Sequence, residues 1–189
     1  MGIYIWAVPV IAVLALFWGV AVYNRLVRLR ALVREGFSGI TVQLRRRADL
    51  VPNLVGTVQG YATHEREVFA EVTAQRAGAI KADSFQATAQ ADNALTAALG
   101  RLMAVVEAYP TLKADGNFRQ LQEELAQIEE QLQGARRYYN ATVRDLNTRV
   151  RSLPDLLIAG PLGFAEEPFY EDGDAAIQSA PKVSFEQGR

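Results

Sequence analysis

The sequence of 189 residues contains no cysteine and only one histidine, His64. Without cysteine the chain can form no disulfide, bind no metal through a thiolate and use no cysteine nucleophile. With one histidine it cannot build a zinc site from several histidines either. Half of the residues are hydrophobic and 22% are charged, which is too apolar for a disordered chain. We therefore expect a folded domain of ordinary size with no metal or cofactor.

Excess charge of one sign is also lacking. The net charge is −1, so no broad basic field attracts nucleic acid, and we expect no nucleic-acid partner. The charges are unevenly placed, however: residues 25–62 carry seven arginines against two acids, and residues 166–189 carry six acids against two basic residues. No glycine-rich phosphate loop follows a strand pattern, so nucleotide binding has no support.

The first 24 residues contain no charged side chain, and residues 3–23 are mostly large and apolar. As a helix this run is about 31 Å long, which matches the roughly 30 Å hydrocarbon core of a bilayer. It lacks the basic start and small-residue cleavage site of a signal peptide. We therefore predict a transmembrane anchor over residues 1–24. Arginines follow the run and none precedes it, which places the N-terminus outside and the following residues in the cytoplasm.

Three small residues, Ala12, Ala15 and Gly19, share one side of this predicted span. Small side chains let a second helix approach closely, so the pattern predicts contact with a second copy of the chain in the membrane. The alternative is that alanine and glycine are ordinary constituents of a membrane helix and align by chance.

Apolar residues recur at helical spacing beyond the span, first from Leu26 to Val51. Pro52 disfavours helix at this point, so we expect a break or sharp bend there, with Asp49 capping a second helix that fades near Gly78. A third, alanine-rich helix is expected over residues 84–108. A fourth begins at Asn117 as its N-cap and ends before Pro154. These patterns predict an all-α protein whose transmembrane helix continues into an elongated antiparallel bundle over residues 25–153.

An irregular tail is expected over residues 154–189, because glycine and proline interrupt any helical pattern there. Its first part is apolar enough to pack on the bundle, and residues 172–189 are expected to be disordered.

Two clusters of acidic residues suggest chemistry only weakly. His64, Glu67 and Glu71 could share a helix face as metal ligands, but a solvated role is the better interpretation of this exposed, glutamate-rich stretch. The pairs Glu123-Glu124 and Glu129-Glu130 alternate with glutamine as on a solvated helix surface, whereas a general acid needs a desolvated cleft.

The basic clusters are better explained by ion pairs than by lipid or nucleic acid. Arg45, Arg46 and Arg47 point around more than half of a helix and lie far from the membrane, so one or more should pair with an acid of the bundle. Arg136 and Arg137 precede the core-like Tyr139, and we expect at least one of them to pair with a carboxylate from another helix, for which Glu65 is the candidate.

In several segments the sequence resembles the LemA family, in matching order over about residues 20–171. The polar and turn residues that carry the resemblance are Asp49, Pro52, Asn53, His64, Glu65, Asn117, Arg136, Arg137, Tyr139 and Asn140. The chain departs from the family pattern at Phe37, Thr41, Glu130 and Leu146.

The resemblance implies a bacterial inner-membrane protein with one N-terminal span, a cytosolic helical bundle, no known enzymatic reaction and a link to envelope homeostasis. We therefore interpret the chain as a non-enzymatic scaffold or adaptor with partners in the bilayer, further copies of itself, and other membrane or cytosolic proteins. The alternative is a protein that binds and remodels lipid directly.

Overall fold

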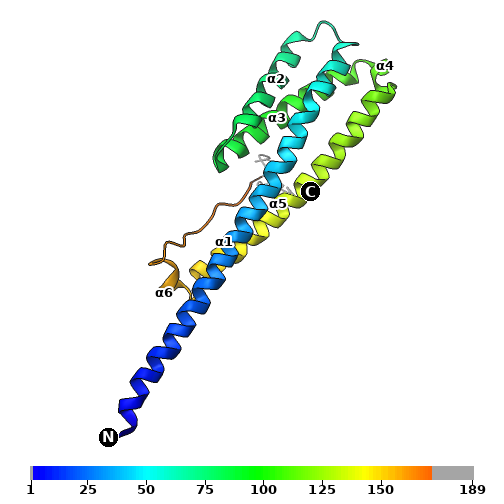
Figure 1. Ribbon diagram of the computed structural model, residues 1–189. Helices are drawn as coiled ribbons and strands as arrows, with labels where there is room; N and C mark the ends of the chain where they lie inside the picture. Colours follow the sequence, from blue (N-terminus) through cyan, green and yellow to red (C-terminus); the bar gives the residue numbers. More distant parts are fainter. Residues whose placement is uncertain (1, 172–189) are drawn as a thin grey trace, which may run out of the picture.

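The computed structural model describes residues 2–171, with side chains from residue 9 onward, and every regular element in this range is an α-helix (Figure 1). The helices are α1 (Gly2–Gln59), α2 (Arg66–Lys81), α3 (Phe85–Glu107), α4 (Pro110–Lys113), α5 (Gly116–Arg151) and α6 (Leu156–Ala159). The predicted all-α fold with a long apolar N-terminal helix is confirmed.

The molecule is elongated because α1 and α5 pack lengthwise against each other (Figure 1). The hairpin of α2 and α3 covers the far half of α1, and the N-terminal part of α1 projects beyond the bundle. Two hydrophobic clusters fill the interior: one lies between α1, α2, α3, α4 and the start of α5, and the other mainly between α1, α5 and the segment after α5. The apolar stripe predicted after the span lines both clusters, through Leu26, Val33, Ile40, Leu44, Ala48 and Val51.

The predicted break at Pro52 is wrong, because α1 continues through this residue to Gln59. Proline has no N–H, so it leaves the carbonyl of Ala48, four residues earlier, without its helical donor. The guanidinium of Arg76 in α2 replaces that donor, with its Nε 2.8 Å from the Ala48 oxygen. A contact from another helix therefore satisfies the one carbonyl that Pro52 leaves open.

The starts of the later helices need two corrections. The second helix begins at Arg66 rather than at Asp49, which instead forms an exposed ion pair with Arg45 at 3.6 Å. The N-cap of α5 is Asp115 and not Asn117, since the Asp115 carboxylate accepts a hydrogen bond from the Phe118 amide at 2.9 Å. This bond, followed by one from the Tyr61 hydroxyl, holds the pKa of Asp115 below its usual value. The third helix, expected over residues 84–108, is α3 (Phe85–Glu107), and the structure shows Ser84 as its N-cap.

The segment after α5 packs on the bundle through part of its side chains, whereas Leu156, Leu157, Leu162 and Phe169 are exposed. It contains the short α6, and its side chains Ala159, Phe164 and Tyr170 are buried. The prediction of disorder for residues 172–189 lies outside the described residues.

The role of Arg76 can be tested by a double-mutant cycle with Pro52. Arg76→Met should cost about 1–3 kcal/mol of unfolding free energy, because it removes the donor from the buried Ala48 carbonyl. In a Pro52→Ala background the new amide bonds to that carbonyl, so the same change should cost clearly less. Denaturant unfolding followed by circular dichroism measures both. Equal costs in the two backgrounds would contradict this role of Arg76.

Candidate functional site

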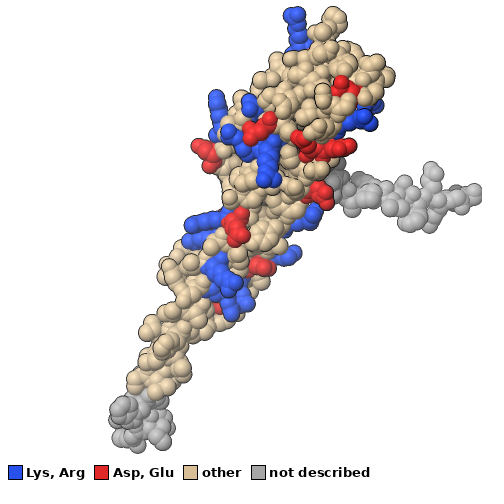
Figure 2. All heavy atoms as spheres, turned by 45° about the vertical axis from the view of Figure 1, so that its right-hand side comes forward, with Lys and Arg blue, Asp and Glu red and all other residues tan. Residues whose placement is uncertain are grey.

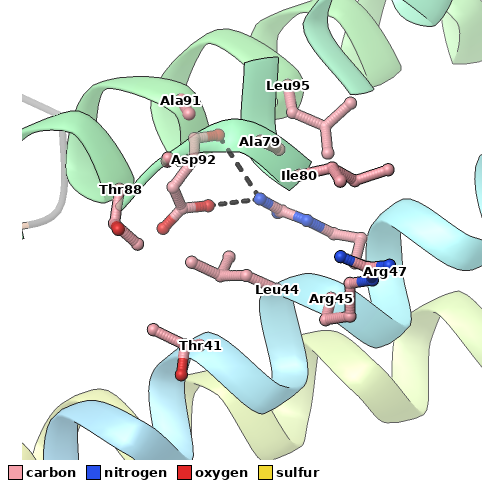
Figure 3. A pocket seen from close by; sticks show the side chains of 11 residues that line it. Thr41, Leu44, Arg45, Arg47, Ala79, Ile80, Thr88, Ala91, Asp92 and Leu95 are labelled. Carbon is pink, nitrogen blue, oxygen red and sulfur yellow. Dashed lines mark hydrogen bonds and ion pairs between the residues drawn. The ribbon is translucent and has the colours of Figure 1, made fainter. Parts of the chain in front are cut away.

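A buried carboxylate, that of Asp92 in α3, lies where α1, α3, α5 and the C-terminal segment meet. Arg47 of α1 pairs with its Oδ1 and Arg136 of α5 with its Oδ2. The hydroxyl of Tyr170 donates a further hydrogen bond to Oδ2 at 2.8 Å. Figure 3 shows Arg47 reaching across from α1, with a second bond to the Asp92 backbone oxygen at 3.3 Å. We call these four residues the Asp92 cluster.

Arg47 also contacts α5, so one side chain links three helices. Its Nη1 lies 2.8 Å from Glu129 Oε1 and 3.0 Å from the Thr96 hydroxyl. A guanidinium buried to 1% exposure needs such partners, because an unpaired buried charge is strongly destabilising. Glu129 thus gives Arg47 a second carboxylate besides that of Asp92. The prediction that an arginine of the triplet pairs inside the bundle is confirmed.

Two tyrosines at this site, Tyr170 of the Asp92 cluster and the neighbouring Tyr139, have raised pKa values. Burial, together with the negative charge of Asp92, raises the pKa of Tyr170 well above its usual value. Burial also raises the pKa of Tyr139 to about 12, and its hydroxyl donates to the Pro168 carbonyl at 2.8 Å. Both hydroxyls therefore remain hydrogen-bond donors at physiological pH.

Residues 164–171, which we call the C-terminal strap, lie along α5 like a bound peptide. The side-chain amide of Asn147 donates to the Glu167 carbonyl and accepts from the Glu167 amide, both at 2.9 Å. Asn140 makes the same pair of bonds with Tyr170, at 3.0 and 2.8 Å. These asparagines are seven residues apart and so share one face of α5. The asparagine side chains therefore bond the backbone N–H and C=O groups of the strap, as a neighbouring strand would do in a sheet.

A cavity of about 190 Å³ adjoins the Asp92 cluster (Figure 3). Its wall includes Arg47 and Asp92, the hydroxyl-bearing Thr41 and Thr88, and apolar side chains such as Leu44. Because two arginines and a hydroxyl occupy the Asp92 oxygens, this carboxylate is not available as a base. Among the described residues no group of three His, Asp or Glu side chains could hold a metal ion. The arrangement favours a structural role.

The structure brings only some of the residues singled out from the sequence to this site. Arg136, Tyr139 and Asn140 lie together around Asp92 and the C-terminal strap. Arg137 is exposed on α5. The remaining family-motif residues are on α1 (Asp49, Pro52 and Asn53), in the turn before α2 (His64 and Glu65) and in the first turn of α5 (Asn117).

The predicted partner of Arg136 is wrong. Arg136 pairs with Asp92 of α3, whereas Glu65 lies just before α2 at the N-cap. The sequence held a signal for this: Asp92 is spaced with Thr88, Leu95 and Leu99 along one face of α3 and is an isolated acid in an otherwise alanine-rich helix. An acid on an apolar stripe should be buried and should need a cation.

The three small residues of the predicted span differ in their surroundings. Ala12 and Ala15 are exposed on the projecting part of α1. Gly19 is half-buried, and a Cβ added there would lie 3.8 Å from Ile158 Cδ1 of α6. That distance is an ordinary van der Waals contact, so the side of α1 at Gly19 faces α6 of the same chain.

Comparison with known proteins gives one family and a set of relatives. The sequence model of the LemA family matches residues 36–185. The chain is similar to Magnetosome protein MamQ 2 and Magnetosome protein MamQ 1 of Paramagnetospirillum magneticum, each 25% identical over 184 residues that cover 82% of this chain and 68% of the relative. Magnetosome protein MamQ of Magnetospirillum gryphiswaldense is 24% identical with the same coverage.

The Asp92 cluster predicts a large loss of stability on Asp92→Asn. This change leaves two buried arginines without their shared carboxylate and should cost about 3–5 kcal/mol of unfolding free energy. The matched control is Asp49→Asn, which breaks only the exposed pair with Arg45 and should cost under about 1 kcal/mol. Denaturant unfolding of the full chain in detergent measures both. Similar costs for the two variants would show that Asp92 does not hold the helices together.

Proposed function

From the premise that this chain belongs to the LemA family, we propose that it is a membrane-anchored, non-enzymatic scaffold at the cytoplasmic face of a bacterial inner membrane. Its bundle would self-associate or recruit membrane or cytosolic proteins, in a role in envelope homeostasis. The similar MamQ proteins are magnetosome proteins by name, and neither that name nor the family's names an enzyme.

The continuity of α1 carries this proposal. Within the described residues, α1 is the one helix long and apolar enough to cross a membrane, and the same helix forms a wall of both hydrophobic clusters. Residues 24–59 of the helix lie beyond the apolar run and measure about 54 Å. A bundle built on them would hold its far end, with the turns before α2 and around α4, at a set distance from the bilayer.

The charges of the Asp92 cluster support a structural rather than a catalytic role. A general base needs an oxygen that can accept a proton, but arginines and a hydroxyl occupy both Asp92 oxygens. The cluster instead links α1, α3, α5 and the C-terminal strap. Such links would keep the shape of a scaffold unchanged when partners bind to it.

Reporter fusions test the proposed orientation. Arg25, Arg28, Arg30 and Arg34 follow the apolar run, so the C-terminus should face the cytoplasm. A C-terminal alkaline phosphatase, active only after export, should be inactive, and a fluorescent protein that matures in the cytoplasm should be active at the same site. The reverse pattern would overturn the proposed location of the bundle.

Substitutions in the span test self-association. Ala12 and Ala15 are exposed on α1, and leucine at both positions would fill the groove in which a second helix could pack. Ala12→Leu with Ala15→Leu should lower the mass seen by native mass spectrometry of the full chain in detergent. The matched control is Val10→Leu with Val13→Leu, on the other side of the helix, which should keep the wild-type mass.

A wild-type protein that is already monomeric, or an alanine variant that keeps the wild-type mass, would remove the membrane groove from the proposal.

A further inference from the structure

A basic cleft lies at the base of the bundle, next to the point where α1 leaves its apolar run. The cleft has a volume of about 640 Å³ and lies between the first bundle turns of α1 and the C-terminal end of α5. α1 contributes Arg25 and Arg28 to its wall, and α5 contributes Arg144 and Arg149. Figure 2 shows that the projecting part of α1 bears no charged side chain and that basic side chains begin where the bundle starts.

The positive charge of this cleft is largely uncompensated. Arg25, Arg28 and Arg144 are exposed and form no ion pair within residues 2–171. Arg149 has a distant partner, Asp155, at 3.6 Å, and keeps 46% of its side chain exposed. Asp145 is the one acid that lines the cleft. Four guanidinium groups beside two carboxylates, those of Asp145 and Asp155, leave excess positive charge that can bind an anion, and arginine binds phosphate through two parallel hydrogen bonds.

Exposed leucines lie beside the cleft. Ser152 lines the cleft, and the next residue, Leu153, is 72% exposed. Leu156 and Leu157 of α6 are 46% and 67% exposed, and Leu162 just after α6 is 50% exposed. So many exposed large apolar side chains within ten residues mark a contact surface rather than a surface meant for water.

The position of α6 along α1 indicates which kind of partner covers these leucines. α6 packs against α1, and Ile158 of α6 lies near Gly19, with its Cδ1 3.8 Å from where a Cβ on Gly19 would be. Gly19 is within the apolar run, whereas Arg25 lies six residues further along the same helix. At about 1.5 Å per residue Arg25 is about 9 Å from the level of Gly19 along the helix axis, and Arg28 about 14 Å. That is the order of separation between the phosphates of a leaflet and the upper part of its acyl chains.

We propose that the cleft binds the headgroup phosphate of an anionic phospholipid whose acyl chains lie against the exposed leucines around α6. This inference rests on the proposed membrane span of α1. The arginines hold the phosphate, and the leucines distinguish a lipid from a free phosphate ion. The site fixes the bundle to the leaflet at a second point besides the span.

Lipid binding to the full chain, purified in a neutral detergent, tests the proposal. Native mass spectrometry with added phosphatidylglycerol or phosphatidylcholine should show preferential retention of phosphatidylglycerol. Arg28→Gln with Arg144→Gln should reduce the affinity for phosphatidylglycerol by about fivefold per arginine, or roughly 25-fold. This pair leaves Arg25, Arg30 and Arg34 as topology signals and leaves the Arg149–Asp155 pair intact.

The matched control removes the same charge from the far end of the bundle. Arg66→Gln with Arg119→Gln should leave the affinity within about twofold of wild type, since both residues are exposed, Arg66 at the start of α2 and Arg119 in the first turn of α5. Leu156→Ser with Leu157→Ser should weaken phosphatidylglycerol binding while the melting temperature stays at the wild-type value. Millimolar inorganic phosphate should not displace the lipid.

Three results would overturn the proposal: equal retention of the two lipids, equal losses in the two arginine pairs, or displacement of the lipid by inorganic phosphate. A fall in oligomer mass in the leucine variant without any loss of lipid would assign those leucines to a second copy instead.

Extraction of the wild-type protein from membranes by alkaline carbonate would contradict the span itself. A protein that resists carbonate but binds both lipids equally contradicts the lipid site alone.

Discussion

One helix sets the arrangement of everything else in this molecule. α1 contains the apolar run of residues 3–23 and, without interruption, one wall of each hydrophobic cluster. The other helices pack on α1 or on its neighbour α5, so their distance from the apolar run depends on α1 remaining straight. The weakest point of such a helix is Pro52, and the bond from Arg76 to the Ala48 carbonyl supports the chain there.

The Asp92 cluster places the remaining elements against this helix. Arg47 is fully buried on α1, and a buried cation requires a carboxylate at one particular place. Asp92 reaches Arg47 only if α3 packs in one register against α1. Arg136 reaches the other oxygen of the same carboxylate only if α5 is also in one register. The buried ions therefore contribute specificity of packing, and Tyr170 extends it to the C-terminal strap.

Local patterns predicted the elements but not their connections. The helical stripe from Leu26 to Val51 and the alanine-rich helix over residues 84–108 follow from spacing and residue type, and both are present. The break expected at Pro52 follows from the missing N–H of proline, but a hydrogen bond from α2 to the open carbonyl compensates for it, so the helix continues. The bonds that hold the C-terminal strap, such as those of Asn147 with Glu167, join chain segments by backbone geometry, which side-chain periodicity does not encode.

The central claim is that α1 is a single rigid helix from the membrane to the bundle, and a distance across it tests this most directly. The chain has no cysteine, so Leu14→Cys and Gly56→Cys introduce the only two labelling sites; Leu14 is 63% exposed, and no atom lies within 4 Å of a Cβ added at Gly56. Pulsed electron paramagnetic resonance in nanodiscs, with labelled protein diluted in unlabelled protein, should give one narrow distribution near 63 Å, about 1.5 Å for each intervening residue. A broad distribution, or one shorter by 10 Å or more (about 15% of that length), would mean that the helix bends or breaks between the bilayer and the bundle, and the account would fail.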